Sequence, residues 1–196
     1  NSISDFVEVL SSFSCVIKSI KNNFFNSSRL LYGDAQQNGN GQQKSDLFEG
    51  SARVPFIISV PGMKTAGQSS SSLTELIDLY PTLADLCNLP QPKHLKGHSL
   101  APLLANPKAT VRQAAYSTTR IRPRLPGFIG KVKPLGRSIR TDRYRYTEWA
   151  DGKYGVEVYD YQTDPREITN LARSAAHTDK VKQLKTIFDQ TRKHTR

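Results

Sequence analysis

The sequence predicts an α/β fold that is followed by a small antiparallel sheet subdomain with a terminal helix. A continuous apolar run over residues 54–60 is typical of a strand buried on both faces, as in a parallel sheet under helices. An amphipathic helical pattern follows from residue 73. Short alternating runs and turn residues then precede a last helical pattern. This order places the end of an α/β domain ahead of an antiparallel subdomain.

The α/β part contains one predicted strand and one predicted helix. The run "RVPFIISVPG" closes at Pro61-Gly62, and the polar connector "GQSSSS" follows. Ser72 and Glu75 are spaced as a capping box, and Pro81 is expected to kink the helix or restart it. The apolar helix positions are Leu73, Leu76, Ile77, Tyr80, Leu83, Ala84 and Cys87. Because Cys87 lies on this stripe, we interpret it as a packed thiol and not a nucleophile.

The later part of the chain predicts a meander of strands. "AYSTTRIR" and "GRSIRTDRYRYTEW" have strand character, the second with a turn at Thr141-Asp142. "ADGKYG" is a turn, "VEVYDY" is a further strand, and a helix is expected from about Ala175. A period of two places Arg143, Arg145, Thr147 and Trp149 on one face and Tyr144, Tyr146 and Glu148 on the other.

The charge is concentrated in one stretch of the chain. The net charge is +11, and residues 108–145 hold eleven basic residues and one acid. Such a stretch suits an anionic partner such as a nucleic acid, an acidic lipid surface or a sulfated polymer, and it suits a solvated face equally well. Cys15 and Cys87 have no zinc or redox spacing. The apolar run near the start is too short and serine-rich to span a membrane, and its charge order is not that of a signal peptide. We therefore make no prediction of compartment.

Five segments together resemble the C-terminal part of the sulfatase family, in the family's order and over about Lys44 to Ala172. They are "KSDLFEGSARVPFIISVPGM", "LIDLYPTLADLCNLP", "LKGHSLAPLL", "GRSIRTDRYRYTEW" and "VEVYDYQTDPREITNLA". The likeness is nearest to iduronate-2-sulfatase-type enzymes. It implies the C-terminal portion of an alkaline-phosphatase-like α/β sandwich. Taken alone, the last segment is a capped turn, a structural corner without chemistry of its own.

The resemblance also implies a chemistry, in which a formylglycine made from Cys or Ser attacks a sulfate ester beside a Ca²⁺ ion. Lys44 matches the lysine that contacts the substrate sulfate, and Asp34 is the candidate calcium ligand. The signature Cys or Ser, x, Pro, x, Arg is absent, because Ser59-Val60-Pro61-Gly62-Met63 ends in methionine. His94 and His98 lack a second ligand at metal spacing and are interpreted as surface residues.

Three parts of the chain follow from this interpretation. Residues 1–33 match nothing and stay unassigned, as misjoined sequence would; residues 34–107 form the end of the α/β core, and residues 108–196 form the antiparallel subdomain and helix. We expect a sulfuric-ester hydrolase fragment that lacks the nucleophile half, acts on a sulfated glycan as part of the whole enzyme and is inactive alone. The unpaired edges of residues 54–60 predict self-association.

Two functions of other kinds remain open on the sequence. One is a non-catalytic binding module that holds sulfated polysaccharide through the basic stretch, with residues such as Arg120, Arg122 and Lys131. The other is nucleic-acid binding through "RTDRYRY", where aromatics alternate with arginines. We rank nucleic acid lowest and expect no such partner, because no nucleic-acid motif accompanies the segment.

Overall fold

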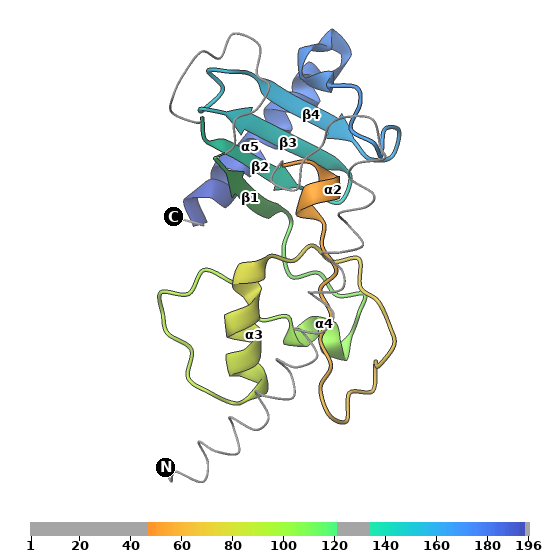
Figure 1. Cartoon of the computed structure of the whole chain (residues 1–196), viewed down its shortest axis with the longest axis vertical. Helices are drawn as coiled ribbons and strands as arrows, with labels where there is room; N and C mark the ends of the chain where they lie inside the picture. The colour runs from red at the N-terminus through yellow and green to blue at the C-terminus, as the bar shows by residue number, and fades with distance from the viewer. Residues whose placement is uncertain (1–46, 121–133, 195–196) are drawn as a thin grey trace. The chain divides into compact units, whose positions relative to one another are not determined.

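The computed structural model describes residues 47–120 and 134–194, and the chain divides into two compact units (Figure 1). Among the described residues, the first unit is formed by residues 54–112. The second unit combines residues 47–53 with residues 113–120 and 134–194. Each unit is described by itself. None of the helices in the described part of the chain has the length and apolar character needed to cross a membrane.

The second unit is built on a four-stranded antiparallel sheet in the order β1-β2-β3-β4. The strands are β1 (Ala115–Thr119), β2 (Gly136–Arg140), β3 (Tyr144–Trp149) and β4 (Val156–Asp160). Their register places Tyr146 opposite both Ile139 and Val158. Each predicted strand of the meander is therefore confirmed, as is the turn between β2 and β3, where the Thr141 N–H donates to the Tyr144 carbonyl.

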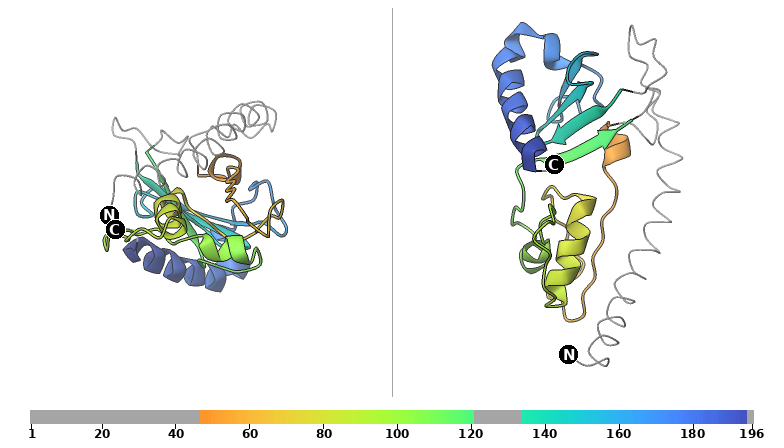
Figure 2. Two further views of the ribbon diagram at one scale, coloured as in Figure 1. Left: turned by 90° about the horizontal axis from the view of Figure 1, so that it is seen from below. Right: turned by 90° about the vertical axis from the view of Figure 1, so that its left-hand side faces the viewer.

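The 17-residue helix α5 (Thr178–His194) covers one face of this sheet, after the short turns η2 (Leu171–Arg173) and η3 (Ala175–His177). Figure 2 shows α5 on one side of the strands and α2 (Glu49–Ala52) on the other. The core between α5 and the sheet is fully buried, and the Tyr146 and Phe188 rings lie 5.3 Å apart. Its buried members are Ala114, Ile139, Tyr146, Val158, Leu184 and Phe188. The helix predicted from about residue 175 is thus confirmed.

The edge of the sheet at the end of β3 depends on one glycine. Gly136 lies directly opposite Trp149, and a Cβ on Gly136 would come within 2.4 Å of the Trp149 ring. The indole can lie flat across the strand only because Gly136 has no side chain. The turn that follows uses left-handed backbone at Ala150, Asp151 and Gly152, which reverses the chain into β4.

The first unit contains three short helical elements: η1 (Leu76–Asp78), α3 (Leu79–Leu86) and α4 (Ala101–Ala105). The capping box lies three residues later than predicted: Glu75, not Ser72, is the capping residue, and its N–H donates to Asp78 Oδ2 at 2.8 Å. The prediction failed because Asp78 has further donors that hold it in place. Pro81 falls in the first turn of α3, where no N–H is needed, so the α-helix restarts ahead of it.

Residues 54–60 do not form the predicted buried strand. They are extended without strand pairing, and most of them are exposed; Ile57 is 46% exposed. The physical reason is that a strand needs a neighbour for its backbone groups, and no strand of the described residues lies in this unit. The predicted turn at Pro61-Gly62 is present, with Gly62 at φ 74°.

Candidate functional site

The two predicted site residues, Lys44 and Asp34, lie outside the described residues, so their roles stay predictions. The described chain begins at Leu47, which only two residues separate from Lys44. The segment from Leu47 to Arg53, here called the anchor segment, is thus the structured part of the chain nearest to the predicted sulfate contact. It belongs to the same unit as the sheet.

Apolar contacts hold the start of the anchor segment. Leu47 is buried, and the Phe48 ring lies 5.8 Å from the Tyr159 ring of β4 in a tilted arrangement. Helix α2 then begins at Glu49, because Phe48 is extended and the N–H groups of Ser51 and Ala52 both donate to its carbonyl. A four-residue helix has little stability of its own. Its position therefore depends on its contacts with the sheet.

A buried cluster of ions provides the strongest of these contacts. Arg145 of β3 is 1% exposed, and its Nη2 donates to Glu49 Oε2 at 2.6 Å. Its Nε donates to Glu167 Oε1 at 2.6 Å and to the Tyr161 hydroxyl at 2.8 Å. Arg140 adds a second cation, since its Nε lies 3.2 Å from Glu49 Oε2. Two guanidinium groups thus face two carboxylates, which balances the buried charge.

The environment keeps this cluster ionised around arginine and neutral at tyrosine. Burial lowers the pKa of Arg145, but Tyr161 and the carboxylates of Glu167 and Glu49 outweigh it and hold the pKa above its ordinary value. Burial raises the pKa of Tyr161, although Arg145 opposes the shift, so the phenol keeps its proton. The Tyr161 hydroxyl accordingly donates to Glu167 Oε1.

Glu167 comes from the capped turn that the sequence predicts. The Asp164 carboxylate accepts the N–H groups of Ile168 and Thr169, each at 2.7 Å, and Asn170 caps η2. Glu167 itself has φ 56°, in the left-handed region, and its Oε2 accepts the backbone N–H of Glu49 at 2.6 Å. The structural role of this corner is confirmed, but the sequence reasoning missed that it reaches α2. The signal was Arg145, a charged residue inside a strand whose neighbours are apolar and aromatic.

A second buried ion cluster lies in the first unit. Arg112 pairs with both Glu75 and Asp78, and Asp78 Oδ1 accepts the N–H of His98 at 2.9 Å. His94 and His98 are exposed, as predicted. Among the described residues, no group of three or more His, Cys, Asp or Glu could hold a metal ion. The described part of the chain therefore does not fit calcium, and no step of a mechanism is derived through it.

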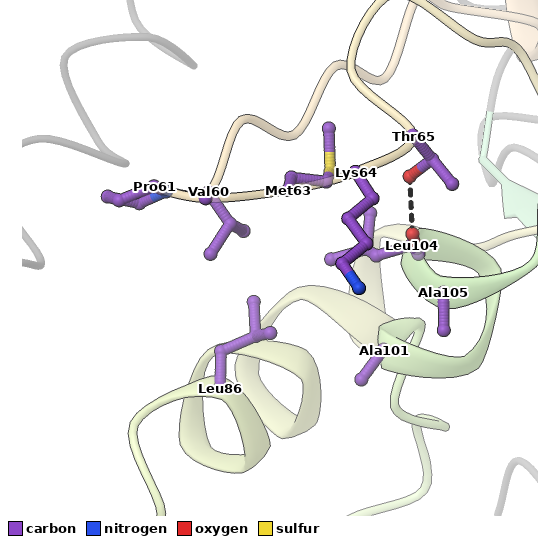
Figure 3. A pocket seen from close by; sticks show the side chains of 10 residues that line it. Val60, Pro61, Met63, Lys64, Thr65, Leu86, Ala101, Leu104 and Ala105 are labelled. Atoms are coloured by element: carbon purple, nitrogen blue, oxygen red, sulfur yellow. Dashed lines mark hydrogen bonds between the residues drawn. The ribbon is translucent and has the colours of Figure 1, made fainter.

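One hollow in the first unit was also considered as a site (Figure 3). It has a volume of about 380 Å³ and an apolar lining that includes Val60, Leu86 and Leu104. The Lys64 amine is its only charged group, and the Thr65 hydroxyl donates to the Leu104 carbonyl. No carboxylate, thiol or imidazole lines it. It can accept an apolar side chain but offers no base or nucleophile for catalysis.

The basic stretch is largely neutralised where it is described. Five of its arginines form ion pairs with carboxylates from other segments: Arg112, Arg137, Arg140, Arg143 and Arg145. This weakens the expectation of an anion-binding surface there. Arg145 and Tyr146 are buried, so these parts of "RTDRYRY" do not form a stacking platform. Arg122, Arg124, Lys131 and Lys133 lie outside the described residues.

Known proteins share both this sequence and this fold. Residues 42–194 match the family described as N-sulphoglucosamine sulphohydrolase, C-terminal. Arylsulfatase K of Gallus gallus is 34% identical over 135 residues, which cover 66% of this chain and 24% of the relative. A protein solved in complex with its substrate D-glucosamine-2-N,6-O-disulfate is 29% identical, with a TM-score of 0.66 over 76% of this chain and 30% of that one. Phosphonate monoester hydrolase of Agrobacterium radiobacter is 28% identical, with a TM-score of 0.62 over 76% of this chain and 31% of that one.

The fold and these relatives define an α/β protein of the alkaline-phosphatase-like type, as the sequence predicts. The chain belongs to the sulfatase family and corresponds to its C-terminal part. It spans about a quarter of the length of the arylsulfatase K that it matches. The activity of a whole sulfatase is therefore a matter for proposal.

Proposed function

We propose that this chain is the C-terminal part of an enzyme that hydrolyses sulfate esters of a sugar, with Lys44 contacting the sulfate. The match over residues 42–194 carries the proposal, because it begins just ahead of Lys44 and continues through the elements that hold the anchor segment. A lysine ammonium in this position would stabilise the negative charge that develops on sulfate oxygens during bond cleavage. Asp34 remains the proposed ligand of a Ca²⁺ ion.

We propose further that this chain alone is catalytically inactive. Its sequence has no Cys or Ser followed by x, Pro, x, Arg, so it has no residue to become the formylglycine. Turnover of 4-nitrophenyl sulfate in the presence of Ca²⁺ should equal that of the Lys44→Ala variant. Turnover well above that control would refute the proposed inactivity.

A chimera tests the family activity directly. Residues 42–194 would replace the matching C-terminal part of Gallus gallus arylsulfatase K, and sulfate release would be followed. The chimera should be active, and Lys44→Ala within it should lower kcat/KM by about 10²-fold or more, because one charged stabiliser of the transition state is lost. A soluble, folded chimera that is indifferent to Lys44→Ala would exclude Lys44 as a sulfate contact.

The substrate class is supported by a single neighbour, whose substrate is a sulfated glucosamine. The narrower expectation of iduronate-2-sulfatase type stays a prediction, and turnover of iduronate 2-sulfate against glucosamine 6-sulfate would decide it. A phosphonate monoester belongs in the same panel, because one neighbour hydrolyses that class. Preference for the phosphonate would overturn the sulfatase assignment.

The alternative is a non-catalytic module that binds sulfated polysaccharide. The ion pairs within residues 108–145 leave less free charge than the sequence suggests. Retention on heparin is therefore expected at low salt and lost at modest salt, as screened surface charge requires. Retention that persists at high salt, together with an inactive chimera, would favour the binding module.

A further inference from the structure

The sulfatase match does not explain why a buried arginine, two glutamates and a left-handed turn converge on a four-residue helix. Arg145, Glu49 and Glu167 come from three separate segments, and Arg145 is 1% exposed. Burying these charges has a large desolvation cost, and apolar residues of similar size often serve stability as well. Such a cluster therefore suggests a demand for a defined geometry.

The contacts of Glu167 show which geometry is defined. Its Oε1 accepts from Arg145 of β3, and its Oε2 accepts the main-chain N–H of Glu49. One carboxylate thus links the sheet to the backbone of the anchor segment. A contact to the backbone fixes the path of the chain, whereas a contact between two side chains would leave that path freer.

The turn that carries Glu167 is built around this contact. A residue other than glycine with φ 56° is strained and persists only where its surroundings hold it. Here Asp164 holds the turn through the N–H groups of Ile168 and Thr169, and the Glu167 N–H donates to the Asp164 carbonyl at 3.1 Å. The strained backbone directs the carboxylate of Glu167 toward Arg145 and α2.

The anchor segment matters because of the residue that precedes it. Only Ser45 and Asp46 lie between Lys44 and Leu47, so the covalent chain keeps the two Cα atoms within roughly 11 Å of each other. Any shift of Leu47 and Glu49 away from the sheet therefore widens the space open to the Lys44 backbone. A charge must be held to a small fraction of an ångström-scale range to stabilise a transition state well.

We infer that Glu167 and Arg145 are positioning residues, which act on the sulfate through Lys44 by fixing the anchor segment to the sheet. This inference rests on the proposed function, since it assumes that Lys44 contacts sulfate. It assigns to the stretch "DPREIT" a role in ligand binding, although its residues are not proposed to touch the ligand.

The test uses the full chain with Glu167→Gln, which removes the charge at nearly constant shape. Asp160→Asn is the matched control, because Asp160 is an equally buried carboxylate of the same unit that pairs with Arg143 and has no contact with α2. Hydrogen exchange of the amides of residues 47–53 should accelerate about tenfold or more in Glu167→Gln and stay within about twofold in Asp160→Asn. Unchanged exchange in Glu167→Gln would overturn the anchoring.

Binding of D-glucosamine-2-N,6-O-disulfate, followed by NMR titration, tests the action through Lys44. Lys44→Ala should weaken binding about tenfold, since a charge-assisted hydrogen bond is lost. Glu167→Gln should weaken it by about threefold or more, and should add nothing in the Lys44→Ala background, because both substitutions then remove the same interaction. A general loss of folding would instead lower binding additively.

The outcomes separate the two levels of the argument. Lys44→Ala without effect on binding would refute the sulfate contact and this inference with it. A weakened Lys44→Ala together with additive effects of Glu167→Gln would overturn this inference alone. If Glu167→Gln does not fold, Glu49→Gln replaces it, because the Glu49 side chain is 21% exposed and its substitution is less disruptive.

Discussion

The two units of the chain differ in how completely they bury their own apolar residues. The second unit closes a core between the sheet and α5, in which Ile139, Val158 and Phe188 have no exposed surface. The first unit instead exposes large apolar side chains, with Leu76 at 62% and Tyr80 at 57%. Its fully buried residues include Asp78 and Thr82, which serve hydrogen bonds.

The difference follows from what each unit can satisfy with its own backbone. The four strands of the second unit pair with one another, so only outer edges remain and one helix covers the apolar face. The apolar run over residues 54–60 has no strand beside it within the described residues of its unit. A sheet that closes its ladders can be self-sufficient, whereas a single strand depends on what lies beside it.

The largest expected effect is in the closed core. Phe188→Ala should lower the free energy of unfolding of the second unit by about 3–5 kcal/mol, because a fully buried ring is lost and a cavity remains. The fluorescence of Trp149, the single tryptophan of the chain, reports this unit in urea unfolding. Tyr80→Ala is the matched aromatic control in the first unit and should leave this transition unchanged. Equal effects of both variants would break the contrast between the units.

Gly97 sharpens the comparison from the other side, because the first unit has a tightly packed point of its own. A Cβ at Gly97 would lie 2.1 Å from the Ile77 carbonyl oxygen, which is backbone and cannot move aside. Gly97→Ala should therefore destabilise this unit by about 1–3 kcal/mol. Faster hydrogen exchange in α3, with unchanged Trp149 fluorescence, is the expected result. Unaltered exchange in α3 would show that this packing is not needed.

The exposed run of the first unit predicts self-association. Ile57→Asp places a charge in an unpaired, 46%-exposed position and should shift the chain from larger species toward the monomer in size-exclusion chromatography with light scattering. Ile168→Asp is the control, since Ile168 is an exposed isoleucine of the second unit. A wild-type chain that is monodisperse as a monomer at high concentration would contradict the prediction.

The smallest expected effect concerns pH and the second unit. The hydrogen bonds from Arg143 lower the pKa of Asp160 below its ordinary value, although burial opposes them. A carboxyl group with a lower pKa in the folded state adds stability above its unfolded pKa of about 3.9, and this is lost as pH falls through the folded value. The stability difference between wild type and Asp160→Asn should thus be constant above about pH 5 and shrink below pH 4. A difference that grows on acidification would reverse the assigned sign.

Much of the fold could be predicted from local patterns. The strands of the second unit and helix α5 were found because alternation and helical spacing coincide with turn residues at Thr141-Asp142 and at residues 150–155. The strand at residues 54–60 was predicted wrongly, because its apolar pattern presumes a sheet that the described residues do not supply. The capping box was misplaced by three residues, since Asp78 is held by His98 and Arg112 from distant parts of the chain.

The candidate site was only partly accessible to sequence reasoning. The resemblance singled out Lys44 and the turn at Glu167, but no spacing in the sequence connects Glu167 with Glu49, which lie 118 residues apart. The arginines of residues 108–145 showed the same limit in reverse. They indicated an anionic partner, and the structure pairs five of them with the chain's own carboxylates.

By itself the sequence determined the class of fold, the order of the elements, the sulfatase relationship and the absence of a formylglycine signature, because these depend on neighbouring residues and local periodicity. Only the tertiary structure decided which charges neutralise one another and which segment holds the chain after Lys44. The reason is physical: an ion pair between residues far apart in the chain is set by folding and burial. Arg145 has the same side chain as a solvent-facing arginine, and its two glutamates alone make it part of the anchor.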